Sequence, residues 1–315
     1  MNTINYIFAA LNNSTNRLLK ALVYFYFISL CGACLSQKDK ASTFLCLTDS
    51  YNREIKLDQA PEKIISLSPG ITEMIFLLHA EEKLIGISDY CNFPEETQHI
   101  AKIGGLQNIN IEKIISLQPD IVLIGSIIPK SEVDKLEKSG ITVVAIKQEE
   151  KLEGMLDAIK IIGQIVDHNA RADSLIQYYE KKLEEYKLNT KCTKNAQSAP
   201  ITVYYVVNFG AGGDYTAPAN SHINEIIQFA GGKNIGDTLT TWNISREYLF
   251  TQNPDIIFVR KEELQHFVNT YPYNLLKAVK ENRVYPIESG WMDIVSPRNF
   301  LAIAEIREKI QNYHP

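Results

Sequence analysis

The chain has 315 residues, a length that suits two domains, each able to bury a hydrophobic core without disulfide bonds. Hydrophobic residues make up 45% of the chain and charged residues 22%, and the mean hydropathy is −0.13. These values exclude a disordered chain, a collagen-like chain and a protein with several membrane spans. The formal net charge of −5 and the pI near 5.8 argue against a nucleic-acid-binding protein, which normally has a basic surface.

The first 33 residues have the pattern of a secretory signal peptide. Two basic residues precede an apolar run over residues 21–30, which is too short to span a bilayer stably. Small residues then lead to Cys34, which resembles a bacterial lipobox with Cys31 at the position where such boxes prefer leucine. This pattern predicts that Cys34 is lipidated as the first residue of the mature protein. The alternative is an ordinary cleaved signal peptide in which Cys34 has no special role.

The other cysteines and the histidines give no sign of a metal site. Cys46, Cys91 and Cys192 are dispersed and contain no Cys-x-x-Cys pair, so they predict neither a disulfide framework nor a zinc site. They allow one bridge, but the sequence does not say which. The six histidines are scattered and never have metal-ligand spacing. We therefore expect no intrinsic cofactor and no bound zinc or manganese.

Strands and helices alternate after a polar tether over residues 35–42. In the first half, the expected strands are residues 63–67, 84–88, 120–125 and 141–146, and the expected helices are residues 72–79, 111–117 and 132–139. Strands separated by helices of this length predict a parallel sheet with right-handed crossovers.

Two longer helical segments follow, over residues 152–166 and 170–188, with an expected break between them. Residues 189–200 are polar and predict a loop. A second α/β set then begins, with expected strands at residues 202–207 and 284–287.

The two α/β sets resemble each other. The segment from Glu112 to Asp120 and the segment from Glu247 to Asp255 both run from a helix through a proline to an aspartate and an apolar strand, with the same spacing. Two similar lobes joined by a helix are therefore expected. The predicted parts are a signal peptide (1–33), a tether and entry segment (34–54), an N-terminal lobe (55–166), a connecting helix (167–189) and a C-terminal lobe (190–315).

Aromatic residues in loops are the main indication of a binding site. In an open parallel sheet, ligands bind beyond the carboxyl ends of the strands, and aromatic faces there suit a large, flat, partly apolar ligand. The alternative is that these rings fill the interface between the lobes. Arg298 is the best-placed cation, because a guanidinium offers a fork to phosphate or carboxylate. The aromatic candidates are Tyr90, Phe93, Phe209, Tyr215, Trp242 and Trp291.

Motifs of common enzymes are missing from the sequence. It contains no Gly-x-Ser-x-Gly elbow, no phosphate loop and no Gly-x-Gly-x-x-Gly fingerprint. A surface-anchored α/β enzyme remains the alternative from another class, and it would need a nucleophile and a base that converge. Cys91 is the candidate nucleophile, although such a residue is more often an inert small hydrophobe. We therefore expect a binding protein and no enzyme.

From residue 62 to residue 310 the chain resembles the substrate-binding proteins of iron-chelate and cobalamin ABC importers. Residues 63–73, 86–94, 117–120 and 229–235 carry the resemblance. The motifs in which Trp242 precedes Ser245-Arg246-Glu247, and Trp291 precedes Ser296-Pro297-Arg298, are most similar to the cobalamin-binding members.

The resemblance implies a class III substrate-binding protein: two α/β lobes with mostly parallel sheets, joined by a single long α-helix, with the ligand cleft between them. It implies a monomer, held in the cell envelope by a lipid anchor on the periplasmic side or the cell surface. The implied protein partners are an ABC importer permease and its ATPase. The implied ligand is bulky and planar, and it is cobalamin or another corrinoid, a ferric siderophore, or haem. A helical connector also predicts a cleft largely formed before binding, because bending a helix breaks its hydrogen bonds.

The resemblance also implies roles for single residues. Glu73 and Glu225 would be exposed acids, one on each lobe, that dock on arginines of the permease. As residues alone, both are acids in a first helical turn, where the helix dipole favours them. Leu106 and Gly290 depart from the cobalamin-binding pattern, which leaves siderophores and haem open. The residues implied to line the cleft are Phe209, Tyr215, Trp242, Trp291 and Arg298.

Overall fold

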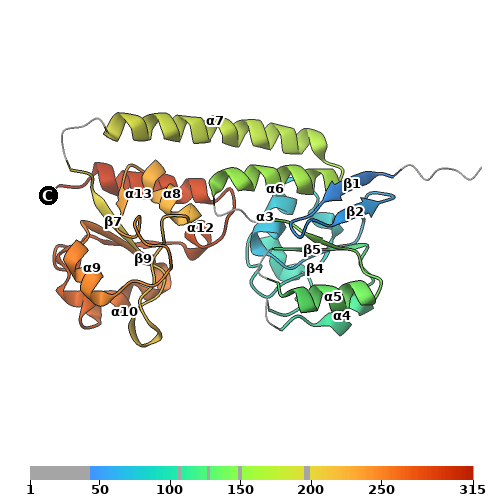
Figure 1. Ribbon diagram of the computed structural model, residues 1–315, viewed down its shortest axis with the longest axis horizontal. Coiled ribbons are helices and arrows are strands. Elements are labelled where there is room, and N and C mark those ends of the chain that lie inside the picture. Colours follow the sequence, from blue (N-terminus) through green and yellow to red (C-terminus); the bar gives the residue numbers. More distant parts are fainter. Residues whose placement is uncertain (1–42, 106–107, 126–127, 148–150, 195–198, 315) are drawn as a thin grey trace, which may run out of the picture. The chain divides into compact units, whose positions relative to one another are not determined.

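The computed structural model describes residues 43–314, except 106–107, 126–127, 148–150 and 195–198 (Figure 1). The predicted signal peptide, Cys34 and Leu106 therefore lie outside the described residues. None of the helices in the described ranges combines the length and the apolar character that a membrane span requires. From Phe44 onward the chain forms one compact unit that contains both lobes.

The N-terminal lobe is built on a four-stranded parallel sheet in the order β4-β3-β5-β6. Every residue of β5 is buried, as expected for an apolar strand in the middle of a parallel sheet. These elements confirm the strand and helix alternation predicted from the sequence. The strands are β3 (Ile64–Ser66), β4 (Leu84–Ile87), β5 (Ile121–Ile124) and β6 (Val143–Ala145), and the helices are α3 (Pro69–Leu77), α4 (Ile111–Leu117) and α5 (Lys130–Lys138).

The C-terminal lobe repeats this topology. Its parallel sheet has the order β10-β9-β7-β8, so in both lobes the second strand lies on one side of the first, and the third and fourth lie on the other. The prediction of two similar lobes is confirmed. The strands are β7 (Thr202–Val206), β8 (Lys233–Asn234), β9 (Ile256–Arg260) and β10 (Val284–Ile287).

Six α-helices accompany these strands in the described part of the C-terminal lobe, and short 3₁₀ turns complete both lobes. The helices are α8 (His222–Phe229), α9 (Arg246–Gln252), α10 (Leu264–Asn269), α11 (Lys277–Lys280), α12 (Ser289–Met292) and α13 (Asn299–Gln311). The turns are η1 (Glu81–Lys83), η2 (Glu95–His99), η3 (Gly210–Gly212), η4 (Lys261–Glu263) and η5 (Tyr273–Leu275).

The matching segments of the two lobes have the same local geometry. Gln118 and Asn253 end α4 and α9 in the left-handed conformation, with φ of 49° and 41°. The aspartates that follow each proline then accept hydrogen bonds from the backbone at the start of the first strand of their own sheet: Asp120 from the Lys63 nitrogen at 2.9 Å, and Asp255 from the Thr202 nitrogen at 2.8 Å. The shared sequence pattern therefore encodes a shared turn.

Two helices connect the lobes. Helix α6 (Leu152–Ile165) contacts α3 of the N-terminal lobe, and α7 (Asn169–Lys194) runs alongside both α6 and α13 (Figure 1). The ring of Tyr179 on α7 stacks on Phe300 of α13 with centroids 5.1 Å apart. One hydrophobic cluster continues from the N-terminal sheet through α6 and α7 into the C-terminal sheet. Helix α7 continues to Lys194, so the predicted loop over residues 189–200 is wrong in its first part.

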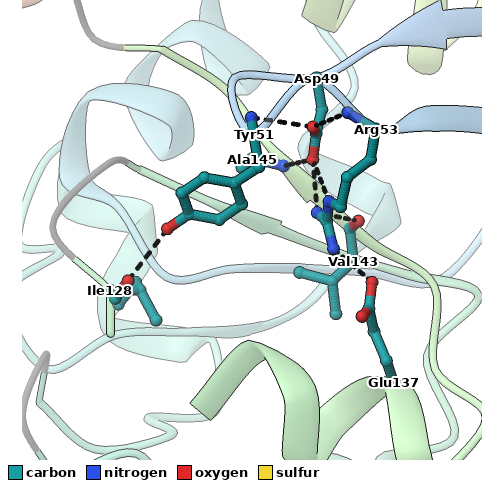
Figure 2. Close-up of polar contacts among 7 residues, drawn as sticks. All are labelled: Asp49, Tyr51, Arg53, Ile128, Glu137, Val143 and Ala145. Carbon is teal, nitrogen blue, oxygen red and sulfur yellow. Dashed lines mark hydrogen bonds and ion pairs between the residues drawn. The ribbon is translucent and has the colours of Figure 1, made fainter. Parts of the chain in front are cut away.

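The chain enters the N-terminal lobe through a hairpin, β1 (Leu45–Thr48) and β2 (Glu54–Leu57), that the sequence did not predict. Figure 2 shows how the turn of this hairpin closes the edge of the sheet at β6. The buried Asp49 carboxylate accepts hydrogen bonds from Arg53 Nε at 2.9 Å and from the Ala145 nitrogen at 3.3 Å. Arg53 also pairs with Glu137 of α5 and donates to the Val143 carbonyl at 3.1 Å. Part of the predicted tether and entry segment is thus fixed to the lobe.

Candidate ligand-binding site

A cavity of about 590 Å³ lies between the two lobes. From the N-terminal lobe, its walls come from the start of α3 and from the loop that follows β4. From the C-terminal lobe, they come from α12, which follows β10, and from the segment that leads to α13. The cavity thus lies beyond the carboxyl ends of parallel strands, where ligands bind in open α/β sheets.

Three of the predicted aromatic residues and Arg298 meet in this cavity. Tyr90 is 58% exposed and Phe93 is 44% exposed, which is unusual for rings of this size. Trp291 is half-buried on α12, and its carbonyl accepts a hydrogen bond from Asn299 Nδ2 at 2.8 Å. Exposed aromatic faces around a cavity provide stacking surfaces for a flat ligand.

Arg298 is held in place by an acid of the other lobe. Its Nε donates to Glu73 Oε2 at 2.9 Å, and its Nη2 pairs with Glu73 Oε1. The guanidinium carbon also lies 4.2 Å from the centroid of the Phe93 ring. Glu73 is 3% exposed, and burial raises the pKa of its carboxyl above the ordinary value against the opposing effect of Arg298.

The prediction that Glu73 is an exposed acid is therefore wrong, because its carboxylate is buried against Arg298. Glu225 is half-buried, and its Oε2 accepts a hydrogen bond from the backbone nitrogen of Leu152, the first residue of α6, at 2.8 Å. Burial raises the pKa of the Glu225 carboxyl too. Each acid thus contacts an element outside its own lobe, and permease docking by either stays a prediction.

The charges that line the cavity are paired. Asp293 forms an ion pair with Arg260 at 2.8 Å and accepts a hydrogen bond from the Tyr205 hydroxyl at 2.6 Å. Burial, with the Asp293 carboxylate beside it, raises the pKa of Tyr205 well above its ordinary value. Glu288 pairs with Lys261 at 3.0 Å. With Arg298 bound to Glu73, every charged side chain of the described lining has a partner of opposite charge.

Phe209, Tyr215 and Trp242 do not line this cavity, although they were predicted to belong to the same site. Phe209 packs edge-on against Phe267, at a centroid distance of 5.1 Å, in a separate cluster of the C-terminal lobe. Trp242 lies in a loop and is 39% exposed, and its backbone carbonyl accepts a hydrogen bond from the Thr216 nitrogen. Phe209 thus packs within the C-terminal lobe, while Trp242 is exposed outside the cavity.

Asn92, Ser289 and Asp293 line the cavity and were not predicted from the sequence. Their nearness to Phe93 and Trp291 in the chain was the only available signal. Gly290, which departs from the cobalamin-binding pattern, leaves the space that the Arg298 side chain occupies. A β-carbon at this position would lie 2.6 Å from Arg298 Nη1, so only glycine leaves room for the guanidinium.

Cys91 is unsuited to act as a nucleophile. It is 1% exposed, and its sulfur lies 3.2 Å from both Thr72 Oγ1 and Ser88 Oγ. Burial raises the pKa of the thiol, which disfavours the reactive thiolate. Cys46 and Cys91 are free, and the described residues contain no group of three potential metal ligands.

Known proteins resemble the chain over most of its length. The sequence model of the family described as periplasmic binding protein matches residues 64–289. The chain is 26% identical to the uncharacterized ABC transporter substrate-binding lipoprotein YvrC of Bacillus subtilis, over 89% of this chain and 91% of that protein. It is 27% identical to the vitamin B12-binding protein of Vibrio vulnificus, over 81% of this chain and 92% of that protein.

A solved structure has the same fold. A periplasmic heme-binding protein from Pseudomonas aeruginosa superimposes with a TM-score of 0.73 at 19% identity, over 81% of this chain and 94% of that one. This likeness confirms the predicted fold class of two α/β lobes with a connecting helix.

Proposed function

The chain belongs to the periplasmic binding protein family, and we propose that it is the substrate-binding lipoprotein of an ABC importer that captures a corrinoid, such as cobalamin, between its lobes. The observation that carries this proposal is the cavity that brings Tyr90, Phe93 and Trp291 together with Arg298. Its volume of about 590 Å³ falls within the range of small-molecule sites. Relatives named for ABC transport and for vitamin B12 binding support the same conclusion.

The paired charges favour a corrinoid over other planar ligands. Haem carries two propionate carboxylates, which need free cations, whereas the rim of cobalamin carries mostly neutral amides. Arg298, the cation in the described lining, is already bound to Glu73. A site whose charges compensate one another suits a ligand recognised by stacking and neutral hydrogen bonds, because unpaired charges are costly to bury.

Haem is the second candidate, and Tyr90 favours it. This phenol is 58% exposed in the cavity, and a tyrosine oxygen can ligate haem iron. Tyr90→Phe should affect the binding of the two ligands differently. Loss of the hydroxyl abolishes an iron bond, but it leaves the ring face on which a corrinoid stacks.

The proposal includes a membrane partner and an anchor. Lipidation of Cys34 would hold a monomer in the cell envelope, on the periplasmic side or the cell surface, next to the permease and its ATPase. Glu73 and Glu225, at corresponding positions of the two lobes, would dock on the permease. In cells, replacing both acids with alanine should impair uptake of the ligand, and a variant that still transports normally would remove them from docking.

Visible absorption spectra test the choice of ligand. We expect cyanocobalamin to co-elute with the purified protein and to shift its absorption bands, while haemin and ferrichrome elute separately. Tyr90→Phe should keep the cyanocobalamin shift. Binding of haemin that disappears in Tyr90→Phe, with no binding of cyanocobalamin, would contradict the corrinoid proposal in favour of haem.

A further inference from the structure

One ion pair joins the lobes across the edge of the cavity. Glu73 is the fifth residue of α3, beyond the first turn in which the sequence placed it, and Arg298 immediately precedes α13, 225 residues later in the chain. Their side chains are 3% and 14% exposed, and two parallel contacts join them. A bidentate arginine–carboxylate pair has a fixed geometry, so this contact sets the position of one lobe edge against the other.

Two further groups fix the guanidinium. The Phe93 ring from the N-terminal lobe lies 4.2 Å from its central carbon. Gly290 of α12 leaves the remaining space, since a β-carbon there would lie 2.6 Å and 2.7 Å from the two terminal nitrogens. The guanidinium thus donates from Nε and Nη2 to Glu73 and also covers one face of the Phe93 ring.

These contacts compete with a ligand in the cavity. A planar molecule that stacks on the face of Phe93 covered by the guanidinium must move Arg298 away from that face. Once Arg298 moves away, a buried Glu73 has no cation beside it and either becomes exposed or takes up a proton, because an unpaired buried charge is costly.

We propose that Glu73, Arg298, Phe93 and Gly290 form a latch that holds the two lobes together until a ligand displaces Arg298. Release of the latch exposes the Glu73 carboxylate, and if the chain serves an importer, as proposed above, only the loaded protein presents this acid to the permease. The latch also lowers the fraction of binding-competent protein, which reduces the apparent affinity by the same factor.

Fluorescence quenching tests the latch without any ligand. In a Trp242→Phe background, Trp291 is the remaining tryptophan and lines the cavity. Glu73→Gln removes the negative charge of the pair and retains Arg298. Gly290→Ala keeps both charges but displaces the guanidinium, so a folding defect specific to one variant cannot explain a shared result. Glu137→Gln is the matched control, because its ion pair with Arg53 is also an arginine–glutamate pair but lies within one lobe and away from the cavity.

We expect Glu73→Gln and Gly290→Ala to raise the acrylamide quenching constant of Trp291 about twofold, as more of the population opens. The control should match the parent protein. Quenching constants of both variants equal to that of the control would overturn the latch.

A second measurement separates this proposal from the proposed function. With cyanocobalamin as the probe, the association rate should rise several-fold in both latch variants and stay unchanged in the control. Altered quenching without any cyanocobalamin binding would support the latch and reject the corrinoid ligand. Normal cyanocobalamin binding with unchanged quenching and unchanged rates would do the opposite.

Discussion

The two lobes share one strand order but use their corresponding acids differently. Glu73 of the N-terminal lobe is bound to the side chain of Arg298, whereas Glu225 of the C-terminal lobe is bound to the backbone nitrogen at the start of α6. The second contact involves the positive end of a helix and cannot move without that helix. One contact between the lobes can therefore be broken by moving side chains, while the other belongs to the connecting helices.

The connections after the first strand differ as well. In the N-terminal lobe, β3 ends at Ser66 and α3 begins at Pro69, whereas in the C-terminal lobe β7 ends at Val206 and α8 begins only at His222. The longer connection contains Phe209 and Tyr215, and Phe209 packs within its own lobe. The exposed rings Tyr90 and Phe93 come instead from a loop of the N-terminal lobe. Similar topology therefore does not give the two lobes equal shares of the site.

The largest difference in stability is expected between the two corresponding aspartates. Asp255 accepts hydrogen bonds from the Thr202 nitrogen and hydroxyl, at 2.8 and 2.7 Å, and from the Tyr313 hydroxyl at 2.8 Å. Asp120 is exposed and binds backbone nitrogens only. Asp255→Ala should therefore lower the free energy of unfolding by about 2–3 kcal/mol, and Asp120→Ala by about 1 kcal/mol. Urea unfolding measures both free energies, and equal losses would show that the two aspartates stabilise their lobes equally.

The pH dependence of unfolding provides a second test of the hydrogen bonds of Asp255. Burial alone would raise the pKa of Asp255, but its hydrogen bonds with Thr202 and Tyr313 lower it below the ordinary value. A lowered pKa contributes stability above the carboxyl pKa of the unfolded chain, about 3.9, and this contribution is lost as the pH falls through the folded value. The stability gap between wild type and Asp255→Asn should therefore narrow on acidification below about pH 4. A gap that widens there would contradict the assignment.

A smaller loss is expected at the joint between the connecting helices. A β-carbon on Gly163 of α6 would lie 2.4 Å from that of Ala172 on α7. Gly163→Ala should cost about 1–2 kcal/mol through overpacking. The double variant Gly163→Ala, Ala172→Gly is the control and should recover much of the loss in thermal unfolding. If the double variant is less stable than Gly163→Ala alone, close packing at this position does not determine how α6 and α7 meet.

The smallest effect on stability is expected at Glu225. Glu225→Ala removes the acceptor of the Leu152 nitrogen and should cost about 1 kcal/mol or less, as for other helix caps. It should leave the acrylamide quenching of Trp291 unchanged, in contrast to Glu73→Gln. Increased quenching in Glu225→Ala would show that both acids hold the cavity closed and would remove the difference between the lobes.

Local patterns predicted the fold well, because buried strands, helix ends and the Pro119-Asp120 and Pro254-Asp255 turns are short-range features. The hairpin of β1 and β2 escaped prediction because its strands have four residues each and because Asp49 binds Ala145, 96 residues away. The end of α7 was placed too early, since polar residues continue the helix.

The candidate site was less predictable, for physical reasons. Chain position placed Tyr90, Phe93 and Trp291 correctly after strands, but Trp291 lies on α12 and not in a loop. It could not show that Phe209 packs on Phe267, because that contact depends on how distant segments meet. It also could not show that Arg298 is bound to Glu73, so an acid expected at the surface is buried.

The binding of cyanocobalamin to two tryptophan variants tests whether the cavity between the lobes holds the ligand. Trp291 lines the cavity between the lobes, whereas Trp242 lies outside it. In isothermal titration calorimetry, Trp291→Ala should weaken binding by about tenfold or more, as at a buried aromatic anchor, and Trp242→Ala by less than about twofold. The reverse order, or unchanged affinity in Trp291→Ala, would contradict a ligand site in this cavity.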